Sequence, residues 1–313
     1  MPGFTTRSKI LKISAGDLLR DLDLSGEEVP YLLELAAEVK RSPAAYAHAL
    51  DGKSIALLFE KPSLRTRLTF ELAIRQLGGT SVGNEGLVGG REPLKDVARN
   101  LDRWVNGIVA RTFEQNTVDE LARWSSVPVV NALTDLFHPC QALADVMTIK
   151  ERFGEFSGVK VAFVGDGNNV AHSLMLTSVR LGANFAMATP PGYEPNEEIL
   201  AQAQELAALS GATVELTCDA AAAVTGAQAV YTDVWASMGQ EQEAAKRRKA
   251  FAPYQVNEAL FGMAAPDAVF MHCLPAKRQE EVTDGVIEGA RSVVFDQAEN
   301  RLHAQKALLL MLL

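Results

Sequence analysis

The chain has 313 residues, of which 48% are hydrophobic and 22% are charged, and its formal net charge at pH 7 is −9. This length allows about two globular domains at roughly 150 residues each, which excludes a single small binding module. The acidic balance, with a sequence pI near 5.2, disfavours nucleic acid or an anionic membrane as a partner. An anionic substrate would therefore need a local cluster of cations.

Targeting signals and cysteines restrict the class further. No basic N-terminal segment leads into an apolar stretch with a cleavage site, and no apolar run approaches the ~20 residues of a membrane helix, so we expect a cytoplasmic protein. Cys140, Cys218 and Cys273 are odd in number and widely spaced. This spacing suggests neither a disulfide framework nor a structural zinc site, and we expect no metal and no cofactor.

The first element expected along the chain is an amphipathic helix. Ser25 with Glu28 makes a capping box, and Val29, Leu32 and Leu33 recur at helical spacing, so this helix should run to about residue 41. Short apolar runs then alternate with helical patterns, at residues 55–59, 107–110, 127–130, 159–164, 185–188, 229–231, 269–272 and 292–295. Strands separated by helices predict βαβ units and parallel sheets.

This alternation occurs twice, before and after a helical stretch at about residues 141–153. We therefore expect an α/β fold of two domains, each a parallel sheet flanked by helices, linked by helix. Residues 300–313 should form a last helix that packs onto a domain. The basic run 246–249 follows Glu243, which lies four residues before Arg247, and predicts a solvated helix face.

A candidate anion site follows the first strand pattern. Ser63-Leu-Arg-Thr-Arg67 precedes a helical pattern at residues 68–77, so Ser63 should open a helix. Backbone N–H groups at a helix start lack intrahelical partners and carry partial positive charge. With two guanidinium groups and two hydroxyls at the same turn, they suit a phosphate. Taken alone, the motif is equally typical of an ordinary serine N-cap with exposed arginines.

Two motifs, Ser63-Leu-Arg-Thr-Arg67 and His138-Pro-Cys-Gln-Ala-Leu-Ala-Asp145, resemble the signatures of the transcarbamylase family. Gly165-Asp-Gly-Asn-Asn169, Asp233-Val-Trp-Ala-Ser-Met-Gly239 and His272-Cys-Leu-Pro275 resemble its ornithine branch, and the match spans nearly the whole chain. The resemblance implies transfer of the carbamoyl group of carbamoyl phosphate to the side-chain amine of L-ornithine. The products would be L-citrulline and phosphate, within arginine metabolism and with the biosynthetic direction favoured.

The resemblance also implies how the chain is organised. Residues 1–145, joined by a returning C-terminal helix at 297–313, would bind carbamoyl phosphate, and residues 146–296 would bind ornithine. Closure of the two domains would bring the substrates together. The family further implies a homotrimer or a multiple of trimers, with active sites near subunit boundaries.

Family positions that hold carbamoyl phosphate map onto residues from several segments. The phosphate would be held by Ser63, by the backbone of Leu64, and by Arg65 and Thr66, and Arg111 would contact phosphate and carbonyl oxygen. His138 would donate to the carbonyl oxygen, since a donor aimed at the developing oxyanion favours the transition state. Gln141 would accept from the carbamoyl NH2, and Arg301 would add a further contact.

The ornithine positions map onto the second half of the chain. They are Asn169, Asp233, Ser237 and Met238, with Asn169 near the α-carboxylate and α-amine. Asp233 attracts the charged ammonium, which is unreactive, so we expect it to position the substrate and relay a proton rather than act as the sole base. The resemblance places the Cys273 thiol near the amine and the Leu274 carbonyl on the carbamoyl NH2. A covalent cysteine intermediate is not required.

One loop departs from the family pattern. In the stretch 83–92 the family usually has a glutamine that contacts carbamoyl phosphate, often in a neighbouring subunit, and Leu87 occupies that place. Leucine cannot form a hydrogen bond, so this contact would be absent or supplied by Asn84 or Arg91.

Three alternatives remain open. One is transfer to another amine, such as N-acetylornithine, putrescine or aspartate. A second is a nucleotide-dependent oxidoreductase, resting on residues 165–170, although Val170 replaces the third glycine of that fingerprint. A third is a catalytically silent binding homologue, which only Leu87 supports. His48, His172 and His303 match no family position and are expected to be structural.

Overall fold

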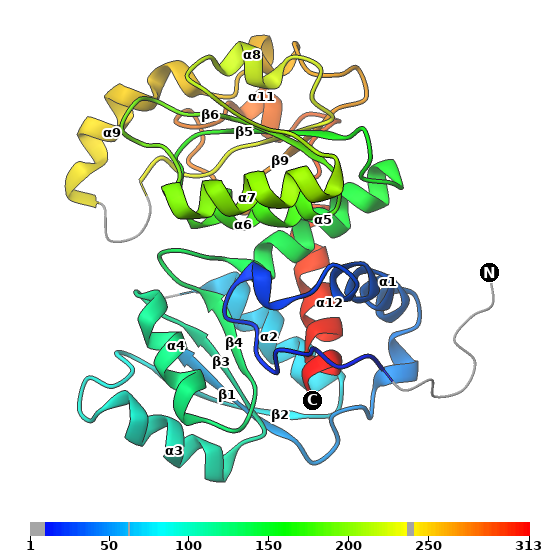
Figure 1. Ribbon diagram of the computed structural model, residues 1–313, viewed down its shortest axis with the longest axis vertical. Coiled ribbons are helices and arrows are strands. Elements are labelled where there is room, and N and C mark those ends of the chain that lie inside the picture. The colour runs from blue at the N-terminus through cyan, green and yellow to red at the C-terminus, as the bar shows by residue number, and fades with distance from the viewer. Residues whose placement is uncertain (1–9, 62, 237–240) are drawn as a thin grey trace. The chain divides into compact units, whose positions relative to one another are not determined.

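The computed structural model describes residues 10–61, 63–236 and 241–313 (Figure 1). It divides into two compact units. The first unit comprises Met1–Leu143 and Arg301–Leu313, and the second comprises Ala144–Asn300. Each unit contains one parallel sheet with helices on both faces, so the predicted α/β fold class is confirmed.

The first unit is built on a four-stranded sheet in the order β2-β1-β3-β4. Its strands are β1 (Ser54–Phe59), β2 (Thr80–Glu85), β3 (Gly107–Arg111) and β4 (Val129–Leu133), all parallel. Its helices are α1 (Glu28–Arg41), α2 (Leu64–Gln76), α3 (Leu94–Trp104) and α4 (Gln115–Trp124). Alternate strand residues such as Ala56, Leu58 and Ile108 pack against α3 and α4. This period of two buries both faces of the sheet.

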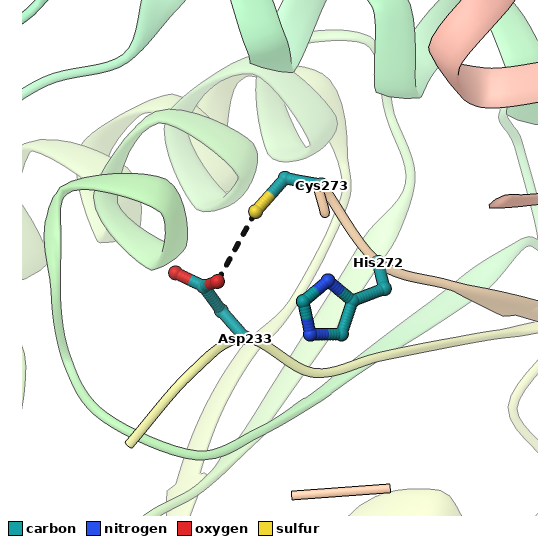
Figure 2. Close-up of side chains that lie close together, drawn as sticks. All are labelled: Asp233, His272 and Cys273. Atoms are coloured by element: carbon teal, nitrogen blue, oxygen red, sulfur yellow. Dashed lines mark hydrogen bonds between the residues drawn. The ribbon is translucent and has the colours of Figure 1, made fainter. Parts of the chain in front are cut away.

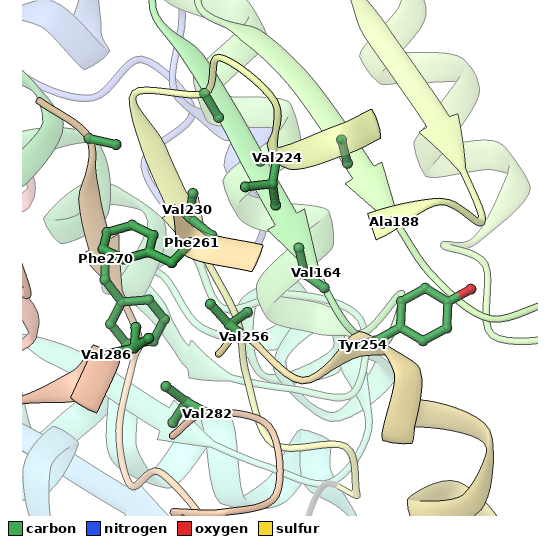
Figure 3. Packing of buried hydrophobic residues seen from close by; sticks show 14 of the residues in the cluster. Val164, Ala188, Val224, Val230, Tyr254, Val256, Phe261, Phe270, Val282 and Val286 are labelled. Carbon is green, nitrogen blue, oxygen red and sulfur yellow. The ribbon is translucent and has the colours of Figure 1, made fainter. Parts of the chain in front are cut away.

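The second unit has a five-stranded parallel sheet in the order β7-β6-β5-β8-β9. Its strands are β5 (Lys160–Val164), β6 (Asn184–Ala188), β7 (Val214–Thr217), β8 (Ala229–Tyr231) and β9 (Val269–Met271). Its helices include α6 (Asn169–Arg180), α7 (Glu197–Ser210), α8 (Ala220–Val224), α9 (Ala244–Phe251), α10 (Glu258–Phe261) and α11 (Asp284–Ile287). Val164, Val230 and Phe270 contribute to its buried core (Figure 3).

Two helices include residues of both units, α5 (Pro139–Phe153) and α12 (Val294–Leu312). The end of α12 packs in the first unit, where the Ile13 N–H donates to the Met311 carbonyl at 3.2 Å and Lys12 Nζ donates to the Leu310 carbonyl at 3.1 Å. The expectation that the C-terminal helix returns to the first domain is confirmed. Within the described residues, no helix is both long and apolar enough to cross a membrane.

Most of the predicted elements are present. The capping box forms, with the Ser25 N–H donating to Glu28 Oε2 at 2.7 Å and the Glu28 N–H donating to Ser25 Oγ at 3.2 Å, and α1 ends at Arg41 as expected. Seven of the eight predicted strands are found, with ends shifted by up to three residues.

The eighth predicted strand, at residues 292–295, is wrong. Ser292 makes only an isolated bridge to Phe270, and α12 begins at Val294. A short apolar run does not distinguish a strand from the first turn of a buried helix. Strands β2 and β7 are absent from the prediction because edge strands need only partial burial, and Thr80–Glu85 and Val214–Thr217 carry polar residues.

The strand order locates the site. In each sheet the chain runs outward from one central strand and then returns to build the other side, so a switch point lies between β1 and β3 and another between β5 and β8. Loops that leave the carboxyl ends of neighbouring strands diverge at such points and form a crevice. The segments after β1 and β5 lead to Ser63 and Asn169, Arg111 is the last residue of β3, and the segment after β8 carries Asp233.

Candidate active site

The first cluster of polar side chains lies at the switch point of the first unit. Ser63 is the N-cap of α2, with an extended backbone and no side-chain capping bond, so its hydroxyl is not used as the ordinary serine cap would use it. The next turn buries Thr66, whose Oγ1 accepts from Arg111 Nη1 at 3.3 Å and from Arg301 Nη2 at 2.9 Å. Two guanidinium groups thus meet at the start of a helix.

Gln141 and His138 complete this cluster. Arg301 also donates from Nη1 to Gln141 Oε1, and Gln141 lies in the first turn of α5. His138 precedes that helix and is 4% exposed. Burial and the positive charges of Arg301 and Arg111 hold the pKa of His138 well below its usual value. The imidazole is therefore neutral at neutral pH and can donate one N–H without adding a charge.

The cluster is suited to an anion with a polar carbonyl group. The structure brings Thr66, Arg111, His138, Gln141 and Arg301 together from four segments. Ser63, Leu64 and Arg65 belong to the same helix start, whose first N–H groups have no intrahelical acceptor. The Leu64 side chain is exposed, so only its backbone is a plausible ligand.

The position of His138 depends on a buried turn that the sequence did not indicate. The Thr134 N–H donates to the Phe137 carbonyl at 2.9 Å, and the Phe137 N–H donates to Thr134 Oγ1 at 3.2 Å. Thr134 Oγ1 also donates to Gln115 Oε1 at 2.7 Å and accepts from Asn131 Nδ2 at 3.3 Å. These bonds fix the turn directly before His138.

The loop at residues 83–92, in which Leu87 replaces the usual glutamine of the family, is held by a hydrogen bond at Val88. The Val88 N–H donates to Glu60 Oε1 at 2.8 Å, and the Phe113 N–H donates to Glu60 Oε2 at 2.9 Å, so Glu60 ties this loop to the segment after β3. Leu87 is 67% exposed and takes no part in the cation cluster of its own unit.

The second cluster lies at the switch point of the second unit (Figure 2). Cys273 Sγ donates to Asp233 Oδ1 at 3.1 Å. Asn168 Nδ2 donates to the other carboxylate oxygen, Oδ2, at 2.9 Å. Asn168 Oδ1 in turn accepts from the N–H groups of Val170 and Ala171 and so caps α6. Both oxygens of the Asp233 carboxylate are therefore oriented by neighbours.

His272 supports the loop that carries Cys273. Its Nδ1 accepts from the Leu274 N–H at 2.8 Å, and its Nε2 lies 3.1 Å from Oε1 of the buried Glu281. The His272 N–H donates to Gln297 Oε1 at 3.0 Å. Leu274 has a positive φ of 57°, a conformation that is strained for leucine and that these contacts hold.

Gln297, which accepts from the His272 N–H, also bonds a residue of the motif at residues 138–145. Gln297 Nε2 donates to Asp145 Oδ1 at 2.6 Å and to the Tyr231 hydroxyl at 3.1 Å. Asp145 is fully buried. The last residue of the His138 to Asp145 motif thus holds Gln297, which holds the His272 backbone.

The remaining predicted ornithine positions are placed only in part. Asn169 is the first residue of α6, next to the Asn168 cap. Ser237 and Met238 lie outside the described residues.

Asp233, His272 and Cys273 form the one possible metal-ligating group among the described residues, with their ligand atoms within 4.8 Å of one another. Both ring nitrogens of His272 are already engaged, with the Leu274 N–H and with Glu281. The imidazole therefore acts as a support for the loop, and we assign no metal here.

The basic run 246–249 is only partly the solvated face that the sequence predicts. Lys246, Arg248 and Lys249 are exposed, but Arg247 is buried. Its Nη1 donates to Asp166 Oδ2 at 2.8 Å and to the Trp235 carbonyl at 3.0 Å, and the expected contact of Nε with Glu243 Oε2 is present at 3.2 Å. Burial raises the pKa of Asp166 to about 6, opposed by the Arg247 charge.

Comparisons with known proteins agree with this geometry. The model of the aspartate/ornithine carbamoyltransferase carbamoyl-P binding domain matches residues 16–151, and that of the Asp/Orn binding domain matches residues 157–312. An ornithine carbamoyltransferase of Anoxybacillus flavithermus is 50% identical, covering 97% of this chain and 98% of that protein.

Solved structures are similar over the same length. The ornithine carbamoyltransferase from Pyrococcus furiosus has a TM-score of 0.93 at 50% identity and covers 96% of this chain and 97% of its own. An acetylornithine transcarbamylase complexed with acetylcitrulline has a TM-score of 0.86 at 32% identity, covering 95% and 99%.

The protein is a two-domain α/β group transferase, with a cation cluster at one switch point and an oriented carboxylate and thiol at the other. The chain belongs to the aspartate/ornithine carbamoyltransferase family. Within that family it is an enzyme of the ornithine carbamoyltransferase group.

Proposed function

We propose that this protein transfers the carbamoyl group of carbamoyl phosphate to the side-chain amine of L-ornithine, by direct amine attack through a tetrahedral intermediate. The observation that carries the proposal is the Asp233 carboxylate, oriented by Cys273 at 3.1 Å and by Asn168 at 2.9 Å. A carboxylate fixed in this way selects an amine substrate and directs its nitrogen.

Carbamoyl phosphate is assigned to the first unit. Ser63, the Leu64 backbone, Arg65 and Thr66 would hold the phosphate at the start of α2, with the guanidinium groups of Arg111 and Arg301 beside Thr66. These charges stabilise the phosphate as a leaving group. The neutral His138 donates to the carbonyl oxygen and strengthens that bond as the oxygen becomes an oxyanion.

Ornithine is assigned to the second unit. The start of α6 at Asn169 would receive the α-carboxylate and α-amine, since a helix N-terminus favours a carboxylate. Asp233 would hold the side-chain amine, with Ser237 and Met238 as further contacts. The nitrogen must lose one proton before attack and a second as the intermediate collapses, and Asp233 beside Cys273 offers the first acceptor.

The electron flow needs no covalent enzyme intermediate. The amine lone pair forms the new C–N bond, the carbonyl electrons move onto oxygen, and their return breaks the bond to phosphate. Cys273 serves as a donor that orients Asp233 and contacts the amine, while the Leu274 carbonyl and Gln141 would accept from the carbamoyl NH2. We place the reaction in arginine biosynthesis, in the cytoplasm, in a homotrimer or a multiple of trimers.

The test measures phosphate release and the carbamoylated amine formed from carbamoyl phosphate, with ornithine, N-acetylornithine, putrescine and aspartate offered in separate parallel reactions. Product from ornithine, at least about 100-fold faster than from the other amines, is the expected result. Faster turnover of another amine would reassign the substrate. No product from any amine would indicate a catalytically silent homologue.

A further inference from the structure

The buried Arg247 connects two segments that the proposed ornithine site uses. Its Nη1 bonds the side chain of Asp166, in the turn that also carries Asn168 and Asn169, and the carbonyl of Trp235, two residues beyond Asp233. The Arg247 and Asp166 side chains are 8% and 9% exposed. A charge pair removed from water to this degree is costly unless its geometry is well satisfied, so it gives little stability by itself.

These contacts close a ring through the site. Arg247 donates to Asp166, and the turn that carries Asp166 also carries Asn168. Asn168 Nδ2 donates to Asp233 Oδ2 at 2.9 Å. Two residues beyond Asp233, the Trp235 carbonyl accepts from Arg247 and completes the ring. Because the ring has no free end, neither segment can shift alone without breaking a buried polar contact.

Other contacts keep the guanidinium group in place. Its carbon lies 4.9 Å from the centroid of the Tyr193 ring. Nε contacts Glu243, which is 56% exposed, so this outer ion pair contributes less than the inner one. Phe251, at the end of the same helix, packs against Trp235 with ring centroids 6.0 Å apart. The helix that carries Arg247 is therefore fixed to the segment after Asp233 by both polar and aromatic contacts.

We propose that Arg247 and Asp166 are positioning residues that set the spacing between the two ends of the amino-acid site and thereby select a diamino acid of ornithine's length. The inference rests on the proposed function, in which Asn169 receives the α-group and Asp233 the side-chain amine. A substrate with one methylene more or fewer would misplace its amine nitrogen when this spacing is rigid. Discrimination of one methylene is worth about 10- to 200-fold in rigid sites.

The experiment compares Arg247→Met, Arg247→Lys and Asp166→Asn with the wild-type enzyme at about pH 8, where Asp166 is ionised. For each protein, kcat and KM are measured for ornithine and for carbamoyl phosphate, together with kcat/KM for lysine and 2,4-diaminobutyrate. The matched control is Arg248→Met on the same helix, because the Arg248 side chain is 55% exposed and pairs with Glu280 at 3.0 Å, away from Asp166 and Trp235.

R247M is expected to raise the ornithine KM by about 10- to 100-fold and to reduce the preference for ornithine over lysine by about tenfold. The carbamoyl phosphate KM should stay within about threefold, and R248M should match the wild type. Lysine keeps the positive charge but lacks the planar guanidinium group with its several donors. The ornithine KM of R247K should therefore lie between those of the wild type and R247M. Because Asp166 and Arg247 act as one unit, the double variant D166N/R247M should be no worse than R247M alone.

An active wild-type enzyme with unchanged ornithine KM and selectivity in both R247M and D166N would overturn this inference and leave the proposed function intact. If R247M fails to fold, the isosteric D166N decides between these outcomes. A wild-type enzyme without citrulline formation would instead reject the proposed function. An equal loss of kcat for all substrates, with no change in selectivity, would assign the pair a purely structural role and also overturn the inference.

Discussion

Cys273 and Asp233, which are 40 residues apart in the chain, meet through a hydrogen bond of 3.1 Å from the thiol to the carboxylate. The contact exists because β8 and β9 are neighbours in register, so the residues that follow their ends emerge side by side. It joins two residues that the family resemblance places beside the ornithine amine.

Replacement of Cys273 by alanine should lower kcat/KM for ornithine by about 10- to 100-fold, because a hydrogen bond to a charged group is worth about 1.5–3 kcal/mol. Serine retains a donor, so C273S should lose less than about tenfold. Steady-state kinetics with the exposed Cys218→Ser as control test this. A C273A enzyme as active as the wild type would show that the thiol does not orient the carboxylate.

Asn168→Asp isolates the second contact of the Asp233 carboxylate. Aspartate is as good an N-cap as asparagine, so α6 and the thermal stability should be nearly unchanged. The new carboxylate would face Asp233 without a donor, and the ornithine KM should rise at least about tenfold through repulsion and misplacement. Asn168→Ser, which keeps the cap and adds no charge, is the control. Equal ornithine KM values for N168D and wild type would contradict the assignment.

The pKa of His138 predicts a pH dependence of stability. Burial, Arg301 and Arg111 depress this pKa in the folded protein, so below about pH 6.5 the unfolded chain binds the proton more readily than the folded one. The free energy of unfolding should therefore fall as pH drops below about 6.5, and His138→Gln should reduce that fall.

Denaturant titrations across this pH range measure the effect, and NMR of the ring nitrogens gives the protonation state directly. A His138 that gains its proton near pH 6.5 in the folded protein would disprove the depressed pKa and, with it, the neutral donor role.

Thr134→Val removes the hydroxyl that fixes the turn before His138 and leaves Gln115 and Asn131 without one partner. We expect a loss of about 1–3 kcal/mol in unfolding free energy. We also expect a fall in kcat of at least about tenfold, with a smaller change in the carbamoyl phosphate KM, because a misplaced donor affects the transition state most. Thr134→Ser should restore most of both. A destabilised T134V with normal kcat would mean that the turn does not position His138.

The sequence identifies the elements whose patterns are strongest. Buried central strands such as β1 and β5 are continuous apolar runs, and α1 shows both its capping box and its periodicity. The prediction fails where tertiary context decides: Val294 starts a helix instead of lying within a strand, and edge strands β2 and β7 are too polar to be recognised. A local pattern cannot report which sheet position a segment will occupy.

The residues of the candidate site likewise fall into those that the sequence identifies and those that only the structure identifies. Ser63, His138, Asp233 and Cys273 stand in motifs that can be found in the chain itself. Glu281 and Gln297 cannot be selected in this manner, since an amide or a carboxylate outside the motifs carries no sign of its partner. Asn168 stands in the motif at residues 165–169, but its bond to Asp233 is visible only in the structure. The burial of Arg247 within a run of four basic residues is likewise invisible, although its neighbours on the helix are solvated.

By itself, the sequence determined the α/β class, the alternation of strands and helices, and the motifs that join the chain to its family, because these depend on local periodicity and on residue types at fixed spacing. Only the tertiary structure decided which side chains meet: the strand order brings Asp233 to Cys273 and Asn168 and Thr66 to Arg111, and helix α12 brings Arg301 to Thr66. The physical reason is that hydrogen bonds between distant segments require the sheet to set their distances, which no stretch of sequence specifies alone.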